Sequence, residues 1–586
     1  MTDIIVGSNR RYQPRRGPRS LAIALILAAV GGVAGYVLFG RLVTYAQPHP
    51  RAPAEGLDLR EDGAGTALAV GANTVAHAGG LTVLRLEGTP AALGAAHGRL
   101  LEAEVGAPSA ALVPAVAAAV GGDGVLDRLI RGPRLRWHYR HVDEGIPGHQ
   151  LVELASLAAV GRGGDEEEPD LDPASARVGA TPPLDYEVLV RTQAGFDLGL
   201  PAPGTAVTGG RSLTRSLSFV AAVRDAAGDR VLVGHSLALP GVGDGGDAAA
   251  AHPTVSFVRP EGVIGFASVG WPGLVGVFTG VNAEGIAVLV HPARTADVTH
   301  TAPGQPVPLL ARDVLENARS LADAIAVLEA AAPLGAASFL VVDGPARSWA
   351  VVERSPSKSA VRRGDGPMVV TGLLEAEAFA DDVENDRARR SRASAQRAQR
   401  ARALVRGLTG PEQALVLLRD GRDGSGAPVP LGYRGALRDP AAVQTVLIDA
   451  STMVLWVADG PDAGGRFRAF DLRHELGAAA PAPPPDLPAL SGDDPAAPAR
   501  VRAARSHLRV ARRALRAGRG ERAREETLRA LALAPTLPEA LLLAGDVARA
   551  GGDHEGARRF YARCQELGID DPDAAEEVKA VLGPGL

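Results

Sequence analysis

Short apolar segments rich in β-branched residues recur from Leu81 to Leu472, and this recurrence is the feature that most constrains the fold. About ten of them have the length and composition of β-strands. Short turns at residues 226–229 (AAGD) and 282–285 (NAEG) join several strands in pairs, which favours antiparallel hairpins over parallel crossovers. Helical patterns are expected at residues 90–105, 309–332 and 382–406. The pattern predicts an α+β domain with large antiparallel sheets.

An uncharged apolar run at residues 21–40 precedes this domain and follows an arginine-containing, cytoplasmic basic segment at residues 1–20. A helix of this length spans about 30 Å, the thickness of a hydrocarbon core, and the arginines favour a cytoplasmic N-terminus. We therefore expect a transmembrane helix in contact with membrane lipid, a linker at residues 41–80, and main domains that are periplasmic or extracellular. A cleaved signal peptide is the alternative, because Thr44 and Ala46 are small residues at a possible cleavage site.

The composition changes again at residues 476–500, where a Pro-rich stretch predicts an extended linker. The all-α region that follows, residues 501–586, matches itself at a shift of 34 residues, which pairs Ala530 with Cys564. This spacing resembles the tetratricopeptide repeat, in which Cys564 is a packing residue and the repeats bind a protein partner. An arginine-rich pair of helical hairpins is the alternative interpretation.

The overall composition excludes several classes of function. Lys and Arg total 62 against 67 Asp and Glu, and the resulting net charge of −5 argues against a polybasic nucleic-acid binder. Cys564 is the only cysteine, so an intramolecular disulfide or a Cys-based zinc site is excluded. No cluster of His, Asp and Glu has metal-ligand spacing and no phosphate-binding loop motif occurs, so we expect neither a metal nor a cofactor.

Two glycine-rich motifs carry a resemblance to a known family. Residues 88–98 have the spacing GTPxxxGxxHG, and residues 263–287 read VIGFASVGWPGLVGVFTGVNAEGIA. With later segments in the same order, they resemble the acyl-coenzyme A:6-aminopenicillanic-acid acyltransferase family of N-terminal-nucleophile hydrolases, which is grouped with the cysteine peptidases. The resemblance assigns residues 81–475 to this domain and implies a four-layer αββα sandwich and acyl chemistry on amides or thioesters.

The resemblance also implies where a nucleophile stands. In that family a strand begins with a catalytic cysteine that self-cleavage frees, and the new α-amine is the base. The matching segment here is Ser216-Leu217-Ser218-Phe219, so Ser216 replaces the cysteine and the Arg215–Ser216 bond is the candidate site of autocleavage. Serine is a competent nucleophile in such enzymes.

Several supporting positions depart from the family pattern. Ser236 and Ala238 stand where the family has Asn and Asp, and Ser338 replaces a later Asn. The family's Thr-Asn-His segment is Thr-Gly-Leu at residues 371–373. Because stabilising an oxyanion requires aimed hydrogen-bond donors, these replacements weaken the catalytic interpretation.

Two interpretations of the function follow. The favoured one is a degenerate member, a pseudoenzyme with a binding or scaffolding role, which stays a single chain. The alternative is an active hydrolase or acyltransferase that uses Ser216 and cleaves itself into two chains. His235 and His291 are interpreted as structural residues, since a lone histidine on a strand is more often structural than catalytic.

Overall fold

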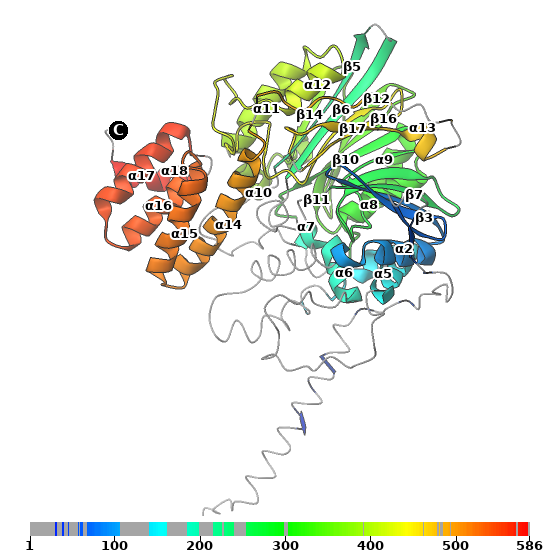
Figure 1. Cartoon of the computed structure of the whole chain (residues 1–586), viewed down its shortest axis with the longest axis horizontal. Coiled ribbons are helices and arrows are strands. Elements are labelled where there is room, and N and C mark those ends of the chain that lie inside the picture. The colour runs from blue at the N-terminus through cyan, green and yellow to red at the C-terminus, as the bar shows by residue number, and fades with distance from the viewer. Residues whose placement is uncertain are drawn as a thin grey trace, which may run out of the picture.

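The computed structural model has an α+β domain built on two β-sheets, with helices over the outer face of each sheet and a set of helices after it (Figure 1). The described residues are 67–105, 140–160, 185–198, 215–225, 228–238, 253–297, 303–390, 392–460, 462–477, 484–492, 494–569 and 572–583, with isolated positions between 30 and 61 and at 137 and 480.

The first sheet has 11 strands, and neighbouring strands are antiparallel except for β4 and β7, which pair in parallel. Its strands, in spatial order, are β1 (Arg60–Glu61), β2 (Ala67–Val70), β3 (Asn73–Ala78), β4 (Leu81–Gly88), β7 (Thr254–Pro260), β8 (Phe266–Gly270), β9 (Thr279–Asn282), β10 (Ile286–Ala293), β11 (Ala336–Asp343), β12 (Ser348–Arg354) and β13 (Ser359–Arg363). The parallel pair joins the N-terminal meander to the central hairpins.

The second sheet has 6 strands, all paired antiparallel. In spatial order they are β14 (Met368–Thr371), β5 (Arg215–Asp225), β6 (Gly228–Ala238), β15 (Gln444–Asp449), β16 (Val454–Ala458) and β17 (Phe467–Asp471). The long hairpin of β5 and β6 lies inside this sheet, between β14 and β15. Ser216 is therefore on an interior strand.

Side-chain alternation along the strands divides the domain into layers. On β10, Val288 and Val290 pack in a core with the outer helices, whereas Ala287 and Leu289 pack between the sheets. A third core lies between the second sheet and its own helices. The helices over the first sheet are α2 (Pro90–Leu100), α5 (Gly148–Val160), α6 (Tyr186–Gln193), α7 (Gly195–Leu198), α8 (Val307–Asn317) and α9 (Leu321–Ala330); those over the second include α11 (Arg392–Val405) and α12 (Pro411–Leu418). The order helix, sheet, sheet, helix agrees with the expected α+β sandwich.

The linker expected at residues 41–80 is wrong for its last part. Residues 67–78 form β2 and β3, which extend the first sheet beyond β4. Val70 and Val75 bury their side chains in the same core as the outer helices, and this apolar burial makes them part of the domain.

Two of the three expected helices are each divided. Residues 309–332 contribute to α8 and α9 rather than to one helix, because Ser320 caps the second by accepting a hydrogen bond from the Asp323 amide at 3.2 Å. Residues 382–406 similarly form α10 (Val383–Arg389) and α11. The helix expected at residues 90–105 is α2, which ends at Leu100.

The Pro-rich stretch at residues 476–500 is not a free linker where the structure describes it. Leu487 exchanges two backbone hydrogen bonds of 3.0 Å with Phe467 on β17. The Trp456 indole donates to the Pro485 carbonyl at 3.0 Å. These contacts hold the stretch against the second sheet, and the next helix already begins at Ala497.

The C-terminal helices form two hairpins and a final helix, as their contacts show. They are α14 (Ala497–Arg516), α15 (Gly520–Leu533), α16 (Pro538–Ala550), α17 (His554–Leu567) and α18 (Pro572–Leu582). We call α14–α18 the helical unit. Small residues allow close approach within it, since a Cβ at Gly545 would lie 2.2 Å from the Tyr561 ring. Cys564 is buried and donates to the Pro538 carbonyl at 3.2 Å, as expected of a packing residue.

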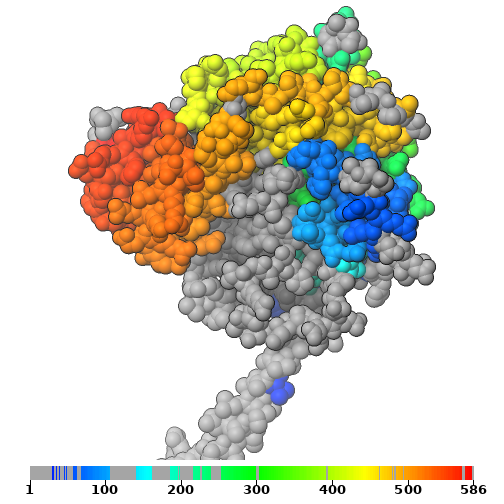
Figure 2. Space-filling view, in the orientation of Figure 1, coloured from blue at the N-terminus to red at the C-terminus, as the bar shows by residue number. Residues whose placement is uncertain are grey.

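The helical unit packs on the loop that precedes β15, beside the second sheet (Figure 2). Gly432 has a φ of +93°, in the left-handed region that favours glycine, and a Cβ there would lie 2.9 Å from Val501 and 3.0 Å from Leu537. Arg505 of α14 donates to the Gly432 carbonyl at 3.1 Å. The loop that precedes β15 is therefore in direct contact with the helical unit.

Among the described residues, no helix is long and apolar enough to cross a membrane. The apolar run at residues 21–40 lies almost entirely outside those residues. The transmembrane helix thus stays a prediction.

Candidate functional site

The first glycine-rich motif builds the contact between α2 and α5. Thr89 caps α2 by accepting from the Ala92 amide at 3.3 Å. A Cβ at Gly94 would lie 2.0 Å from the Glu153 carbonyl oxygen of α5. A Cβ at Gly98 would lie 2.8 Å from the Leu157 carbonyl oxygen, also of α5. The glycines are required because the two helix backbones nearly touch.

The second motif is tied to the first by a buried histidine. His97 on α2 accepts a hydrogen bond from the Gly273 amide at 3.0 Å, and burial lowers the pKa of its imidazole to about 4. Asn282 holds the following turn, because its side chain donates to the carbonyls of Leu315 in α8 and Ala318 just after it, and accepts from two backbone amides. Both motifs position elements of the fold, and the second also carries Thr279, whose hydroxyl lies 2.6 Å from His235 Nδ1 in the interior.

Ser216 and Ser218 lie on the face of β5 that points between the sheets. Their neighbours Leu217 and Phe219 pack in the core with the helices over the second sheet, so alternation places both serines on the opposite face. Ser216 is 2% exposed and Ser218 is fully buried. The candidate nucleophile therefore sits in the interior between the two sheets.

A buried histidine from the other sheet connects the two hydroxyls. His291 on β10 has its Nδ1 2.8 Å from Ser216 Oγ and its Nε2 2.7 Å from Ser218 Oγ. Burial lowers the pKa of His291 well below its usual range, with the neighbouring His235 and Arg397 adding to the effect. A neutral imidazole has one donor and one acceptor nitrogen, so it accepts from one serine and donates to the other.

A second buried histidine continues the polar network across the sheets. His235 on β6 has its Nδ1 2.6 Å from Thr279 Oγ1, and its ring centroid is 4.9 Å from that of His291. Gln444 donates to the same Thr279 hydroxyl at 2.6 Å. Burial lowers the pKa of His235 to about 3, and its Nε2 has no hydrogen-bond partner among the described residues. We call Ser216, Ser218, His235, Thr279, His291 and Gln444 the intersheet polar cluster.

The two other predicted site residues lie in different places. Ser338 on β11 is directly opposite His291 and donates to the Leu373 carbonyl at 3.1 Å, so it borders the intersheet polar cluster. Ser236 pairs with Leu217 and therefore shares the face of β5 and β6 that points to the helices over the second sheet, as does Ala238 by alternation. The structure thus does not bring Ser236 together with Ser216.

The residue before Ser216 is held by a buried ion network. Arg215 pairs with Ala238 across the β5–β6 hairpin, and its guanidinium is 2.5 Å from Asp439. Asp439 also lies 3.5 Å from Arg505 of α14 and 3.9 Å from Arg397 of α11. Although burial opposes ionisation, these guanidinium groups hold the pKa of Asp439 well below its usual range. A contact with the helical unit therefore lies directly behind the candidate cleavage site.

Sequence reasoning placed Ser216 and Ser338 near the site but did not predict the histidine contacts. Side chains alternate along β10, so His291 lies on the same face as Ala287 and Leu289, which point between the sheets. That alternation, combined with knowledge that the two sheets pack face to face, could have placed His291 opposite Ser216. The packing of one sheet on the other depends on contacts between residues that are distant in sequence.

Comparisons with known proteins support one family. The family model described as "Acyl-coenzyme A:6-aminopenicillanic acid acyl-transferase" matches residues 248–429, a region that contains His291 and Ser338 and begins after Ser216. No curated protein matches the chain significantly.

Solved structures give weaker likenesses. An N-acylethanolamine-hydrolyzing acid amidase ortholog from Caenorhabditis elegans has 16% identity and a TM-score of 0.29, with 40% of this chain and 93% of that chain covered. A mutant conjugated bile acid hydrolase from Clostridium perfringens has 13% identity and a TM-score of 0.30, with 47% and 99% covered. These values establish no activity for this chain. The family match, however, confirms the resemblance that the motifs indicated: residues 248–429 match the model of the acyl-coenzyme A:6-aminopenicillanic acid acyl-transferase family.

Proposed function

We propose that this chain is an exported, membrane-anchored protein that retains the N-terminal-nucleophile fold with a degenerate site, does not cleave itself, and serves as a binding or scaffolding protein. The observation that carries the proposal is the position of Arg215. Self-cleavage would separate Arg215 from Ser216 and create the free α-amine that such enzymes use as their base. Arg215 is instead paired in the sheet and ion-paired with Asp439 in the interior.

The surroundings of Ser216 support the same proposal. Its hydroxyl is almost completely buried and bound to His291. Ala238 and Leu373, which replace polar family residues, contribute no side-chain hydrogen-bond donor for an oxyanion. A buried Ser–His–Ser bridge between the two sheets stabilises the fold without requiring any reaction, because it satisfies two buried hydroxyl groups.

One observation favours the alternative function, an active acyl hydrolase or acyltransferase. When the proton of His291 is on Nε2, its Nδ1 accepts from Ser216 Oγ at 2.8 Å, which is the geometry that a general base requires. In that arrangement the imidazole, rather than an α-amine, would activate Ser216. The alternative then includes serine catalysis with or without cleavage of the chain.

The deciding experiment is intact-mass spectrometry of the full-length protein beside the Ser216→Ala variant. We expect one uncut chain in both samples. Two fragments that meet at Ser216 and are lost in the variant would overturn the proposal. A second measurement, labelling with a fluorophosphonate probe, tests serine reactivity without cleavage; we expect no label on Ser216, and labelling that disappears in His291→Gln would establish the alternative.

For the helical unit, we propose tetratricopeptide-like repeats that bind a protein partner. The support is the pair of helical hairpins and the burial of small residues at matching positions, namely Ala511, Ala523, Ala530, Gly545 and Ala557. Leu528 on α15 is 52% exposed and is a suitable residue for contact with a partner. Crosslinking from residue 528 in cells tests this role; the absence of any heteromeric product would contradict it.

Membrane anchoring through residues 21–40 is part of the proposal and depends on the sequence alone. Extraction with carbonate should leave the full-length protein in the membrane fraction, and protease added outside the cytoplasmic membrane should digest the two-sheet domain. Removal of residues 1–40 should release it from the membrane. Recovery of the intact protein in the soluble cytoplasmic fraction would contradict the anchor.

A further inference from the structure

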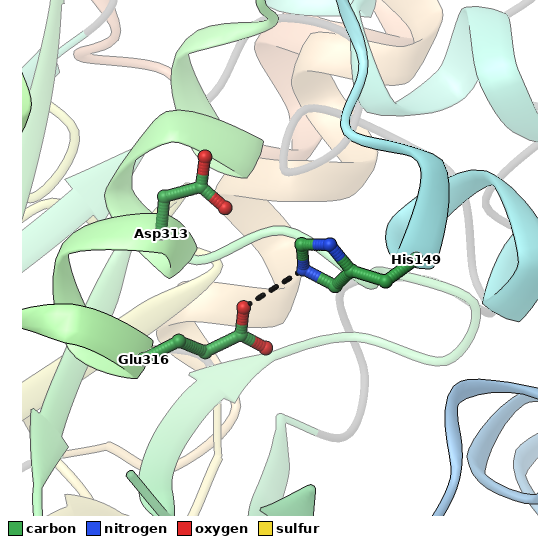
Figure 3. Close-up of side chains that lie close together, drawn as sticks. All are labelled: His149, Asp313 and Glu316. Atoms are coloured by element: carbon green, nitrogen blue, oxygen red, sulfur yellow. Dashed lines mark hydrogen bonds and ion pairs between the residues drawn. The ribbon is translucent and has the colours of Figure 1, made fainter. Parts of the chain in front are cut away.

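Three side chains with the chemistry of metal ligands lie close together in the outer helix layer, between α5 and α8 (Figure 3). His149 is at the start of α5, and Asp313 and Glu316 are one helical turn apart on α8. One ligand atom from each of the three residues lies within 4.8 Å of the others. His149 Nε2 is 3.0 Å from Glu316 Oε2, and the Asp313 carboxylate faces the same space.

The carboxylates are oriented by other side chains, as metal ligands usually are. Asp313 accepts from Gln150 Nε2 and from Gln305 Nε2, each at 2.6 Å, through different oxygens. Glu316 accepts from Arg312 Nε through its Oε1 at 2.8 Å, which leaves Oε2 for the shared space. Each of the two carboxylates is thus held in place by at least one neighbour outside the cluster.

An unused acceptor points to a ligand that donates hydrogen bonds. Gln150 is fully buried, and the amide group that contacts Asp313 carries an Oε1 with no hydrogen-bond partner among the described residues. A buried amide oxygen without a donor costs about 1–3 kcal/mol. A water molecule bound to a metal ion at the cluster would supply that donor.

The local charge also favours a cation. Arg312 contacts Glu316 at 2.8 Å and Glu153 at 2.6 Å, and both carboxylates are almost fully buried. Asp313, on the same helix as Glu316, adds a third carboxylate to a region with this one guanidinium group. A divalent ion would balance the remaining negative charge in a region where desolvation makes an uncompensated charge costly.

We propose that His149, Asp313 and Glu316 bind a divalent ion of the Zn²⁺ type. One imidazole with two carboxylates favours such an ion over Ca²⁺ or Mg²⁺, which prefer oxygen ligands alone. Tetrahedral ligands at Zn²⁺ are about 3.3 Å apart, so the observed separations need only small side-chain rotations. The ion replaces the proton shared by His149 and Glu316, and that proton leaves to solvent.

The proposed site joins two helices that already share the Gln150–Asp313 hydrogen bond and the Arg312–Glu153 ion pair. His149 is 42% exposed at its side chain, which gives the ion access from solvent, whereas Glu316 is 1% exposed and fixes the inner end. Three protein ligands leave one position for water. The ion therefore serves as a crosslink between α5 and α8 and stabilises the folded chain by mass action.

The experiment titrates chelator-treated full-length protein with ZnCl₂ and, separately, with MgCl₂, by isothermal calorimetry. We expect saturable Zn²⁺ binding that includes one site lost in both His149→Ala and Asp313→Asn, and no comparable Mg²⁺ binding. Gln150→Ala, which removes a supporting contact, should weaken this site ~10-fold or more. The melting temperature should rise with Zn²⁺ in the wild type and not in His149→Ala.

His141→Ala is the matched control. His141 and Glu144 form an exposed pair at 2.5 Å with no third ligand within the described part of the chain, so this variant should keep the Zn²⁺ site. The proposal is overturned if the wild type shows no such site, or if His149→Ala and Asp313→Asn bind Zn²⁺ as the wild type does. Because neither variant touches the intersheet polar cluster, failure here leaves the proposed function unaffected.

Discussion

Replacing Asp439 by Ala should destabilise the protein strongly, because this carboxylate compensates three guanidinium groups in the interior. Arg215 lies 2.5 Å from it, Arg505 lies 3.5 Å away and Arg397 lies 3.9 Å away. Breaking a buried ion pair by removing one partner costs about 3–5 kcal/mol, since the other charge stays buried without compensation. We expect the free energy of unfolding to fall by at least that amount.

The matched control is Asp494→Ala. Asp494 pairs with Arg500 at 2.6 Å on the surface, at the start of the same α14, and exposed pairs contribute about 0–1 kcal/mol. Urea denaturation followed by tryptophan fluorescence reports on the two-sheet domain, and far-ultraviolet circular dichroism reports on all helices. Asp439→Ala should shift both transitions to lower urea, because the carboxylate touches the two-sheet domain and the helical unit.

The pH dependence provides a separate test of the same network. The pKa of Asp439 is lower in the folded state than in the unfolded state, so its contribution to stability is present above the unfolded pKa and is lost as pH falls through the folded pKa. Wild-type stability should therefore decrease as pH falls below about 5, and the decrease should be smaller in Asp439→Asn. A loss of less than ~1 kcal/mol in Asp439→Ala at neutral pH would refute the ion-network argument.

Three further predictions test other parts of the structure. Gly94→Ala should lower the free energy of unfolding by ~1–3 kcal/mol by overpacking the α2–α5 contact, whereas Gly148→Ala, with open space around it, should change thermal stability little. Burial raises the pKa of Asp197 to about 8, so its contribution to stability decreases from the unfolded pKa up to pH 8, and Asp197→Asn should flatten the stability measured across that range. His291→Ala should cost ~2–4 kcal/mol in urea denaturation by leaving two buried hydroxyl groups without their partner, and the exposed His77→Ala should cost almost nothing.

The sequence predicted the α+β class because the strand patterns and short turns are local signals. The same signals could not divide residues 309–332, where one serine cap interrupts a pattern that is apolar on both sides. Nor could they show that residues 67–78 join the first sheet, since small residues such as Ala and Gly gave that stretch the composition of a linker. β3 pairs with β4 across a two-residue turn, but the burial of Val70 and Val75 against the outer helices is a tertiary contact that composition does not reveal.

The candidate site was only partly predictable for a related reason. The position of Ser216 followed from a motif, but its partner His291 comes from the other sheet. The metal ligands that we propose were missed because His149 and Asp313 are far apart in sequence and only the packing of α5 on α8 brings them together. Residue spacing along the chain can identify ligands that lie on one helix or strand, but not ligands that come from two elements distant in sequence.

The alternation of β5 and β6 limits what chemistry the site can retain. Ser218 and His235 are directly opposite each other and face the other sheet, whereas Ser236 faces the helices over the second sheet. A replacement at position 236 therefore changes a different layer from the one that contains the Ser216 hydroxyl. If Ser216 reacts in the uncut chain, His291 is the imidazole in contact with its hydroxyl and in place to accept the proton, and the oxyanion must be stabilised by groups other than Ser236. The loss of the family's asparagine is thus weaker evidence against catalysis than the burial of Ser216 and the pairing of Arg215.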